Sequence, residues 1–82
     1  MARTEVKPTN YVGKRIKQMR EAKNMTQDEL SAAIGIDSIT VSRYERGKSA
    51  PNAEKLVSIA RTLDCTTDFL CGMTDTLTLK ES

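Results

Sequence analysis

The sequence predicts an all-α fold, a compact bundle of five short helices. Apolar residues recur along the chain at the spacing of an amphipathic helix, and residues that begin and end helices alternate between these stretches. A length of 82 residues suffices for one hydrophobic core and is too short for two. We therefore expect a single domain over residues 11–72, between a flexible N-terminal arm (1–10) and a C-terminal tail (73–82).

The first helix is expected over residues 11–23. Val12, Ile16 and Met19 are spaced i, i+4 and i+7, with charged and polar residues between them, which is the pattern of one buried helix face. The preceding arm, MARTEVKPTN, shows no such period and contains a proline. It is therefore predicted to be flexible, with Arg3 and Lys7 exposed on it.

The stretch NMTQDEL carries the sharpest local signal in the chain. Thr26 as N-cap and Glu29 three residues later form a capping box, in which each side chain bonds the other residue's backbone N–H. Met25 and Leu30 occupy the two positions of a hydrophobic staple around this cap. A second helix is therefore predicted to begin at Gln27.

Two short helices are expected to follow one another across a tight turn. Gly35 suits the left-handed residue that ends a helix, so the second helix is short. Asp37 is a second N-cap and Gly47 a second stop, which together predict a third helix over residues 38–46. The buried side of the second helix is expected to consist of Leu30, Ala33 and Ile34.

Two further helices are predicted before the tail. Pro51 followed by the N-cap Asn52 marks the start of the fourth helix. Its expected apolar stripe consists of Ala53, Leu56, Val57, Ala60 and Leu63. The stretch TTDFLCG predicts a fifth helix of one or two turns, capped by Thr66 and closed by Gly72.

Composition excludes several classes of protein. The chain has no histidine, and Cys65 and Cys71 alone cannot complete a four-ligand zinc site or form a CxxC redox pair. We therefore predict two reduced thiols, no metal and no cofactor. No nucleophile-and-base arrangement and no glycine-rich phosphate loop is present, so an enzyme is not expected. No apolar run approaches the roughly 18 residues of a membrane span, which predicts a soluble, cytoplasmic protein.

The charge of the chain is polarised along its length. The net charge is only +2, but residues 1–50 carry 10 Lys/Arg against 6 Asp/Glu, whereas residues 51–82 carry 3 against 5. This polarity permits nucleic-acid binding through one face and does not establish it, because most surface charges only solvate a protein.

The predicted third helix has an outward face of mixed chemistry. At about 100° per residue, one side gathers Ser38, Ile39, Ser42, Arg43 and Arg46, while Val41 and Tyr44 fall on the opposite, packing side. Arginine and serine suit the base edges of a DNA major groove, and an apolar side chain suits a thymine methyl group. The alternative is an ordinary solvated helix face, on which Ile39 partly packs against a neighbour.

The helix before it strengthens the DNA interpretation. In a pair of short helices, the first braces the second and can bind phosphate through the free N–H groups at its N-terminus. Gln27 lies at that N-terminus and could add its side-chain amide to the same contact.

The stretch MTQDELSAAIGIDSITVSRYERGKSAP resembles the Cro/repressor-type helix-turn-helix family, also called the xenobiotic-response-element family. The resemblance covers about residues 11–72. Its marks are a T-Q-x-E-L opening from Thr26 to Leu30, the turn glycine Gly35, the apolar Val41, and a Y-E-R-G-K-x-x-P ending at residues 44–51. It implies a five-helix bundle of the lambda-repressor-like DNA-binding type.

The resemblance also implies roles for individual residues. Ser38, Ile39, Ser42 and Arg43 match the family's base-reading positions, the four that the helical period had already placed outward. Contacts to DNA phosphates are expected from Gln27, Thr26, Arg46, Lys48 and Lys14. The family commonly joins the arginine of its first helix to the glutamate that ends its third, which here implies an ion pair between Arg20 and Glu45.

Two departures from the family pattern are visible. Ser31 stands where the family usually has alanine, and serine is small enough to fit there. The base-reading positions carry no glutamine or asparagine, the side chains best suited to adenine. The operator sequence therefore does not follow from the resemblance.

The predicted function is sequence-specific binding of double-stranded DNA as a transcriptional regulator, most simply a repressor that occupies an operator. A homodimer is expected, because specificity normally comes from two domains on half-sites about 34 Å apart. The available apolar surfaces are Phe69, Leu70, Leu77 and Leu79, although Phe69 also fits an ordinary core position. Leu77 and Leu79 alternate with threonines and would suit a strand only beside a partner edge, so we favour a loose tail.

Two alternatives stay open on the sequence. One is an antitoxin-like module that binds a partner protein, with DNA binding secondary. The other is DNA binding without sequence preference, through phosphate contacts of Lys14, Arg15, Lys17 and Lys48. Arg3 and Lys7 could reach a groove of the DNA, but an idle arm is the simpler expectation.

Overall fold

The computed structural model describes residues 9–72, and within them it contains five α-helices and no strand. The helices are α1 (Thr9–Ala22), α2 (Gln27–Ile34), α3 (Ser38–Glu45), α4 (Ala53–Leu63) and α5 (Thr67–Leu70). The all-α, five-helix prediction is confirmed. The expectations for Arg3, Lys7, Leu77 and Leu79 lie outside the described residues.

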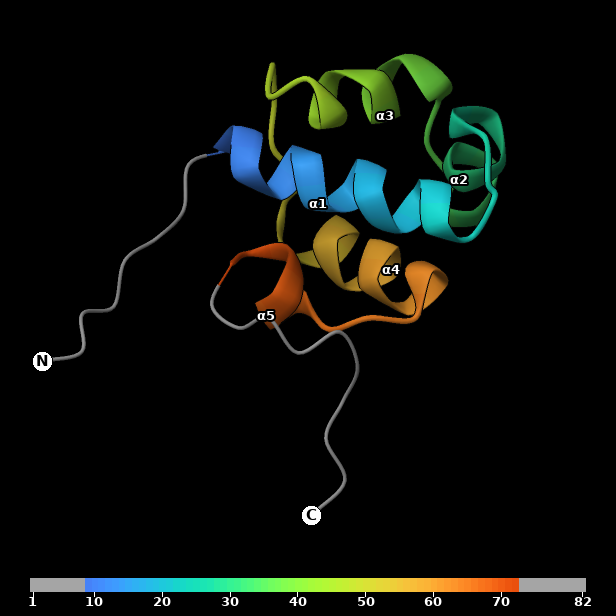
Figure 1. Cartoon of the computed structure of the whole chain (residues 1–82). Coiled ribbons are helices and arrows are strands. Elements are labelled where there is room, and N and C mark those ends of the chain that lie inside the picture. Colours follow the sequence, from blue (N-terminus) through green and yellow to red (C-terminus); the bar gives the residue numbers. More distant parts are fainter. Residues whose placement is uncertain (1–8, 73–82) are drawn as a thin grey trace, which may run out of the picture.

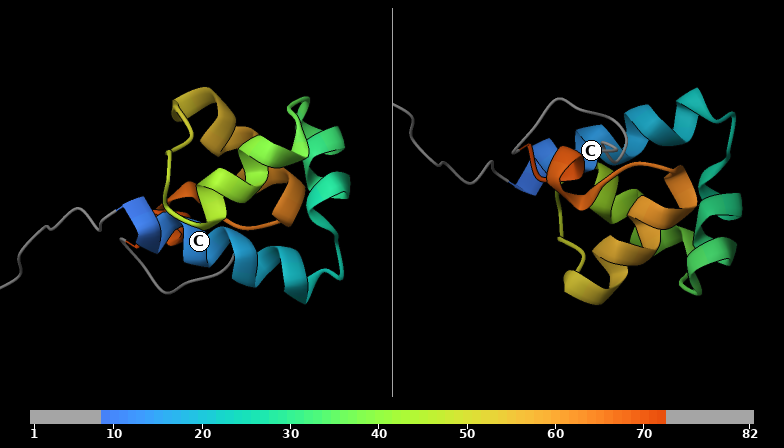
Figure 2. Two further views of the ribbon diagram at one scale, coloured as in Figure 1. Left: turned by 90° about the horizontal axis from the view of Figure 1, so that it is seen from above. Right: turned by 90° about the horizontal axis from the view of Figure 1, so that it is seen from below.

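Helix α1 runs through the middle of the bundle. It packs against α3 on one side and against α4 and α5 on the other (Figure 1). Helix α2 closes one end, where it contacts α3 and α4, and the views from above and below show it beside the ends of its neighbours (Figure 2). The bundle thus has an α3 side and an α4–α5 side, separated by α1.

Local capping explains where the helices begin. The side chains of Thr26, Asp37, Asn52 and Thr66 each accept a hydrogen bond from the backbone N–H three residues later. The start of α1 differs from the prediction, at Thr9 instead of residue 11, and α3 ends at Glu45 with Arg46 as its C-cap. Such differences of one or two residues are usual at helix ends.

Left-handed residues explain where the helices end. Gly35 has φ 75° and closes α2 as expected. Asn24 and Asp64 also have positive φ, 57° and 62°, after α1 and α4. Short polar side chains of this kind tolerate the left-handed region, and neither residue was predicted to end a helix.

The core is one cluster to which every helix contributes. Its buried apolar side chains are Ile16, Met19, Leu30, Ile34, Val41, Tyr44, Ile59, Ala60, Leu63, Phe69 and Leu70. Ser31, the departure noted in the sequence, is buried beside them, and its hydroxyl donates to the Asp28 carbonyl oxygen at 2.8 Å. A buried serine is therefore satisfied inside its own helix.

The predicted buried faces of α2 and α4 need correction. Ala33 is exposed on α2. On α4, Ala53 and Val57 are exposed, while Ile59, which the predicted stripe omitted, is fully buried. The actual stripe of α4 runs through Leu56, Ile59, Ala60 and Leu63, also at helical spacing. The helix is rotated toward Ile59 because α4 must face α1, α2 and α5 together.

The expected dimer surface on α5 is wrong for both of its described residues. Phe69 is 2% exposed and Leu70 is fully buried, so both side chains belong to the core. Arg15 of α1 covers Phe69, with its guanidinium carbon 3.9 Å from the ring centroid. Neither side chain offers an apolar surface to a second copy of the chain.

Replacing Thr26 with alanine should lower the free energy of unfolding by about 1 kcal/mol. The Thr26 hydroxyl oxygen accepts from the Glu29 N–H at 3.0 Å, and the Thr26 N–H donates to the Glu29 carboxylate at 2.8 Å. Thermal unfolding should show a Tm about 4–8 °C lower. Thr26→Ser is the control, since it keeps the hydroxyl. Equal losses in both variants would mean that the methyl group matters and the cap does not.

Candidate nucleic-acid interface

The outward face of α3 is the most unusual surface of the described chain. Ile39 is 69% exposed, and Val57 is the one other large apolar side chain that is exposed among residues 9–72. Arg43 is exposed beside it, and Ser38 and Ser42 are half-buried. On the opposite side of α3, Val41 is fully buried and Tyr44 is 8% exposed. The four residues predicted to read bases thus share the accessible side of one helix, while their roles stay predictions.

The N-terminus of α3 is fixed by Asp37. Its carboxylate accepts a hydrogen bond from the Thr40 N–H at 2.7 Å. Hydrogen bonds from the side chain and backbone of Thr40 lower the pKa of Asp37. Because the folded pKa is the lower one, this cap contributes stability above the pKa of Asp in the unfolded chain and loses it as the pH falls through the folded pKa.

Three helices meet at a buried ion pair that holds α3 in place. The Glu45 carboxylate accepts hydrogen bonds from Arg20 Nε at 2.6 Å and from Arg20 Nη2 at 3.2 Å. Arg20 is 9% exposed and Glu45 8%. Hydrogen bonding to Glu45 raises the pKa of Arg20, against the opposing effect of burial. The pair that the family resemblance implies is therefore present, and it joins α1 to the C-terminus of α3.

Gln27 extends this ion pair to α2. Its side-chain amide nitrogen donates to Glu45 Oε1 at 3.0 Å, and Arg20 Nη1 donates to the Met25 carbonyl oxygen at 2.6 Å. One N–H of the Gln27 amide is thereby engaged, and the second remains for an outside acceptor. The phosphate role predicted for Gln27 from the sequence did not include this internal contact.

The N-terminus of α2 is less open to an anion than the sequence suggested. The Thr26 N–H and hydroxyl oxygen both belong to the capping box, so only the hydroxyl proton of Thr26 is left to donate. Asp28 and Glu29 also place two carboxylates in the first turn. These charges oppose the helix dipole's attraction for phosphate, which leaves Gln27 as the main candidate there.

The predicted phosphate contacts from basic residues divide into two groups. Lys14, Arg46 and Lys48 are exposed, as is Lys17. Arg15 is different: its guanidinium bonds the Tyr11 hydroxyl and stacks on Phe69 of α5. The expectation of a phosphate contact from Arg15 in the non-specific alternative therefore loses support, because this side chain faces α5 and not α3.

Gly13, for which no role was predicted, sets the position of α3. A Cβ atom at Gly13 would lie 2.1 Å from the Tyr44 carbonyl oxygen and 2.9 Å from that of Glu45. The backbone of α1 thus passes directly against the last turn of α3. Gly13 carries no motif in the sequence, so only the packing of the two helices reveals its role.

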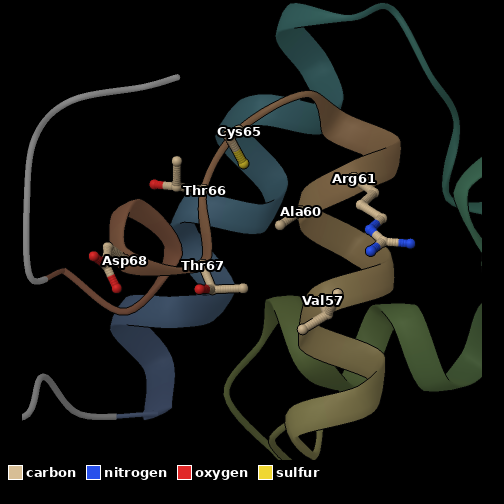
Figure 3. Close-up of a pocket in the computed structure, with 7 residues that line it drawn as sticks. All are labelled: Val57, Ala60, Arg61, Cys65, Thr66, Thr67 and Asp68. Atoms are coloured by element: carbon tan, nitrogen blue, oxygen red, sulfur yellow. The ribbon is translucent and has the colours of Figure 1, made fainter. Parts of the chain in front are cut away.

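A groove lies on the other side of the bundle, between α4 and α5. It has a volume of about 320 Å³ and is lined by Val57, Ala60, Arg61, Cys65, Thr66, Thr67 and Asp68 (Figure 3). Arg61 stands on the α4 wall and Asp68 on the α5 wall. Because α1 separates α4 and α5 from α3, an occupant of this groove would leave the outward face of α3 free (Figure 1).

The two cysteines flank α5 in the sequence. Cys65 and Cys71 are free and half-buried, and burial raises the pKa of both thiols. Within residues 9–72, no group of three or more potential ligands is placed to hold a metal ion. In the same range, no helix has the length and apolar character needed to cross a membrane.

The fold and this surface define the class of protein: a helix-turn-helix domain of the Cro/repressor type, in which α2 braces α3. The chain belongs to the helix-turn-helix family, whose model matches residues 16–70. The resemblance noted in the sequence is thereby confirmed.

Individual relatives agree with this assignment. Repressor protein C2 of Salmonella phage P22 is 31% identical over 62 residues, which cover 76% of this chain and 29% of the length of the C2 protein. The cryptic phage CTXphi transcriptional repressor RstR of Vibrio cholerae is 38% identical over 61 residues, which cover 74% of this chain and 54% of the length of RstR. A crystal structure of the P22 c2 repressor with a synthetic operator has a TM-score of 0.70 at 28% identity, covering 82% of this chain and 94% of that chain. The chain thus spans about half or less of these two curated relatives.

Proposed function

We propose that this protein binds double-stranded DNA as a sequence-specific transcriptional regulator, a repressor that acts in the cytoplasm by occupying an operator. The observation that carries the proposal is the outward face of α3, where a 69% exposed isoleucine stands among serines and an arginine. A side chain such as Ile39 is costly in water, and contact with a thymine methyl group in a major groove would remove that cost. Two of its relatives, the C2 repressor of phage P22 and the CTXphi repressor RstR, are phage repressors, which supports the same function.

The proposed contacts divide between bases and phosphates. Ser38, Ile39, Ser42 and Arg43 read base edges, and Arg43 is suited to a bidentate contact with guanine. Gln27, Thr26, Lys14, Arg46 and Lys48 supply phosphate contacts around the groove. Gln27 reaches phosphate with the amide N–H that Glu45 leaves free, so the brace between α2 and α3 also orients this contact. No catalytic step is part of this function.

Arg43→Ala should change base preference. Selection of duplexes from a random library at about 0.15 M salt, which suppresses purely electrostatic binding, should yield a two-fold symmetric motif for the unchanged protein. The variant should lose discrimination at one base pair per half-site, by about 1–3 kcal/mol. Lys48→Ala is the control, expected to weaken all sequences alike. Uniform weakening by both variants would support non-specific binding, and the absence of any motif would point to a protein partner.

The groove between α4 and α5 is the surface we propose for homodimer formation. Its charges would be self-complementary: a two-fold axis through the groove would bring Arg61 of one copy opposite Asp68 of the other, and the reverse contact would repeat it. Val57, 42% exposed at the groove, supplies an apolar centre. We propose this surface for the dimer in place of Phe69 and Leu70, which are buried in the core.

Exchanging the two charges tests this interface. Arg61→Glu or Asp68→Arg alone should bring like charges together and reduce cooperative binding to a duplex with two half-sites, by about threefold or more. The double variant should restore the cooperativity, since the pair is only reversed. Binding to a single half-site is the control and should not change in any variant. Single variants with unaltered cooperativity would exclude this groove as the dimer interface.

A further inference from the structure

Arg46 makes a contact that the phosphate assignment does not explain. Its Nε donates to the hydroxyl oxygen of Ser42 at 3.2 Å, one helical turn back toward the outward face of α3. Arg46 is exposed and the bond uses only Nε, so the contact commits one of its donors and leaves the two terminal nitrogens uncommitted by it.

The bond from Arg46 fixes whether the Ser42 hydroxyl acts as a donor or as an acceptor toward an outside partner. A serine hydroxyl has one proton to donate and two lone pairs to accept with. For this reason serine alone bonds to several bases and distinguishes them poorly. In Ser42, one lone pair is occupied by Arg46, and the positive charge beside the oxygen disfavours a second donor.

The hydroxyl proton of Ser42 has no partner within the described part of the chain. Ser31 shows the contrast, because its hydroxyl donates to the Asp28 carbonyl oxygen inside α2. Ser42 instead accepts from Arg46, and its O–H is left for an acceptor outside the protein. The side chain is half-buried on the same face as Ile39 and Arg43.

We propose that Arg46 is a positioning residue that fixes Ser42 as a hydrogen-bond donor. At the base pair that Ser42 contacts, the protein then favours an edge with an acceptor, such as guanine O6 and N7 or thymine O4, over the amino group of cytosine. The inference rests on the proposed DNA-binding function and adds to it, because it assigns a specificity-determining role to a residue outside the four base-reading positions.

The test uses the full chain in four forms: unchanged, Ser42→Ala, Arg46→Met, and both substitutions together. Each form is used to select duplexes from a random library, and affinities for the selected site and its single-base variants are measured at several salt concentrations. Ser42→Ala identifies the base pair that Ser42 contacts. Both side chains lie at the surface of α3, and a thermal melt of each form checks that the fold is intact.

The expected result is a local change of specificity. Arg46→Met should reduce the preference for the acceptor edge at the Ser42 base pair by about threefold to tenfold, the range of one hydrogen bond. It should leave the preferences at other base pairs unchanged. In the Ser42→Ala background, Arg46→Met should have no further effect at that base pair, because the hydroxyl it orients is absent.

Three results would overturn the proposal. Arg46→Met could weaken all sequences by one factor and reduce the slope of log affinity against log salt by about 1, as a phosphate contact alone predicts. The Ser42 base pair could favour a donor edge, or Ser42→Ala could leave every preference unchanged while the motif persists. In these cases the proposed DNA-binding function stands. Failure of the unchanged protein to select any motif would remove both proposals.

Discussion

Arg20→Ala is expected to lower the free energy of unfolding by about 3–5 kcal/mol. The substitution leaves the Glu45 carboxylate, 8% exposed, with the Gln27 amide as its one remaining side-chain donor. It also removes the bond from Arg20 to the Met25 carbonyl oxygen, which fixes the loop between α1 and α2. The whole free energy of unfolding of a small domain is about 5–15 kcal/mol. Urea unfolding should therefore show that the variant is only marginally stable.

Lys23→Ala is the matched control for the effect of charge. Lys23 pairs with Asp64 at 3.6 Å, but the two side chains are 38% and 81% exposed. Solvent screens such a pair, so its loss should cost less than about 1 kcal/mol. Replacing Arg20 and Glu45 together with methionine should recover much of the stability that Arg20→Ala loses, because no charge is then left buried. If Arg20→Ala and Lys23→Ala had equal effects, the ion pair would not hold the three helices together.

The starts of α2 to α5 could be predicted because they depend on neighbours in sequence. Thr26 and Glu29 close their capping box within three residues, and Asp37 and Asn52 act over the same distance. The left-handed turn at Gly35 is equally local. Such signals require no knowledge of the rest of the fold.

The rotation of α4 could not be predicted in the same way. Ile59 and Val57 are both apolar, and the sequence alone supports a stripe that includes either one. The structure buries Ile59 and leaves Val57 42% exposed, because α4 must face three other helices at once. The exposure of Val57, and with it the groove beside α5, is a property of packing between elements that are distant in sequence.

The candidate site shows the same division. The helical period alone separated the outward side chains of α3 from Val41 and Tyr44, because a helix in contact with the core on one side must expose the other. The helical period does not predict which groups the long side chains contact. Arg15 bonds Tyr11 and stacks on Phe69, and Gln27 donates to Glu45 across 18 positions of sequence. Each of these contacts depends on which groups the tertiary fold places near the side chain.

Gly13→Ala is the second substitution with a large expected effect, and its sign is opposite to helix propensity. Alanine is more favourable than glycine inside a helix by about 1 kcal/mol. At this position the new Cβ would lie 2.1 Å from the Tyr44 carbonyl oxygen. Both clashing atoms are fixed to helix backbones, so no rotamer change relieves the contact, and α1 and α3 must separate. We expect a loss of about 3 kcal/mol or more, at or beyond the upper end for overpacking.

The separation should also reach the ion pair, because the second close atom is the Glu45 carbonyl oxygen at 2.9 Å. Gly35→Ala is the control for losing a glycine as such: its φ is +75°, but a Cβ there meets nothing within 4 Å. That variant should lose only about 1–2 kcal/mol through the left-handed backbone. Chemical unfolding of both variants ranks the two effects. A Gly13→Ala protein more stable than the unchanged one would show that α1 does not pass against the last turn of α3, and the position of the outward face of α3 would need another support.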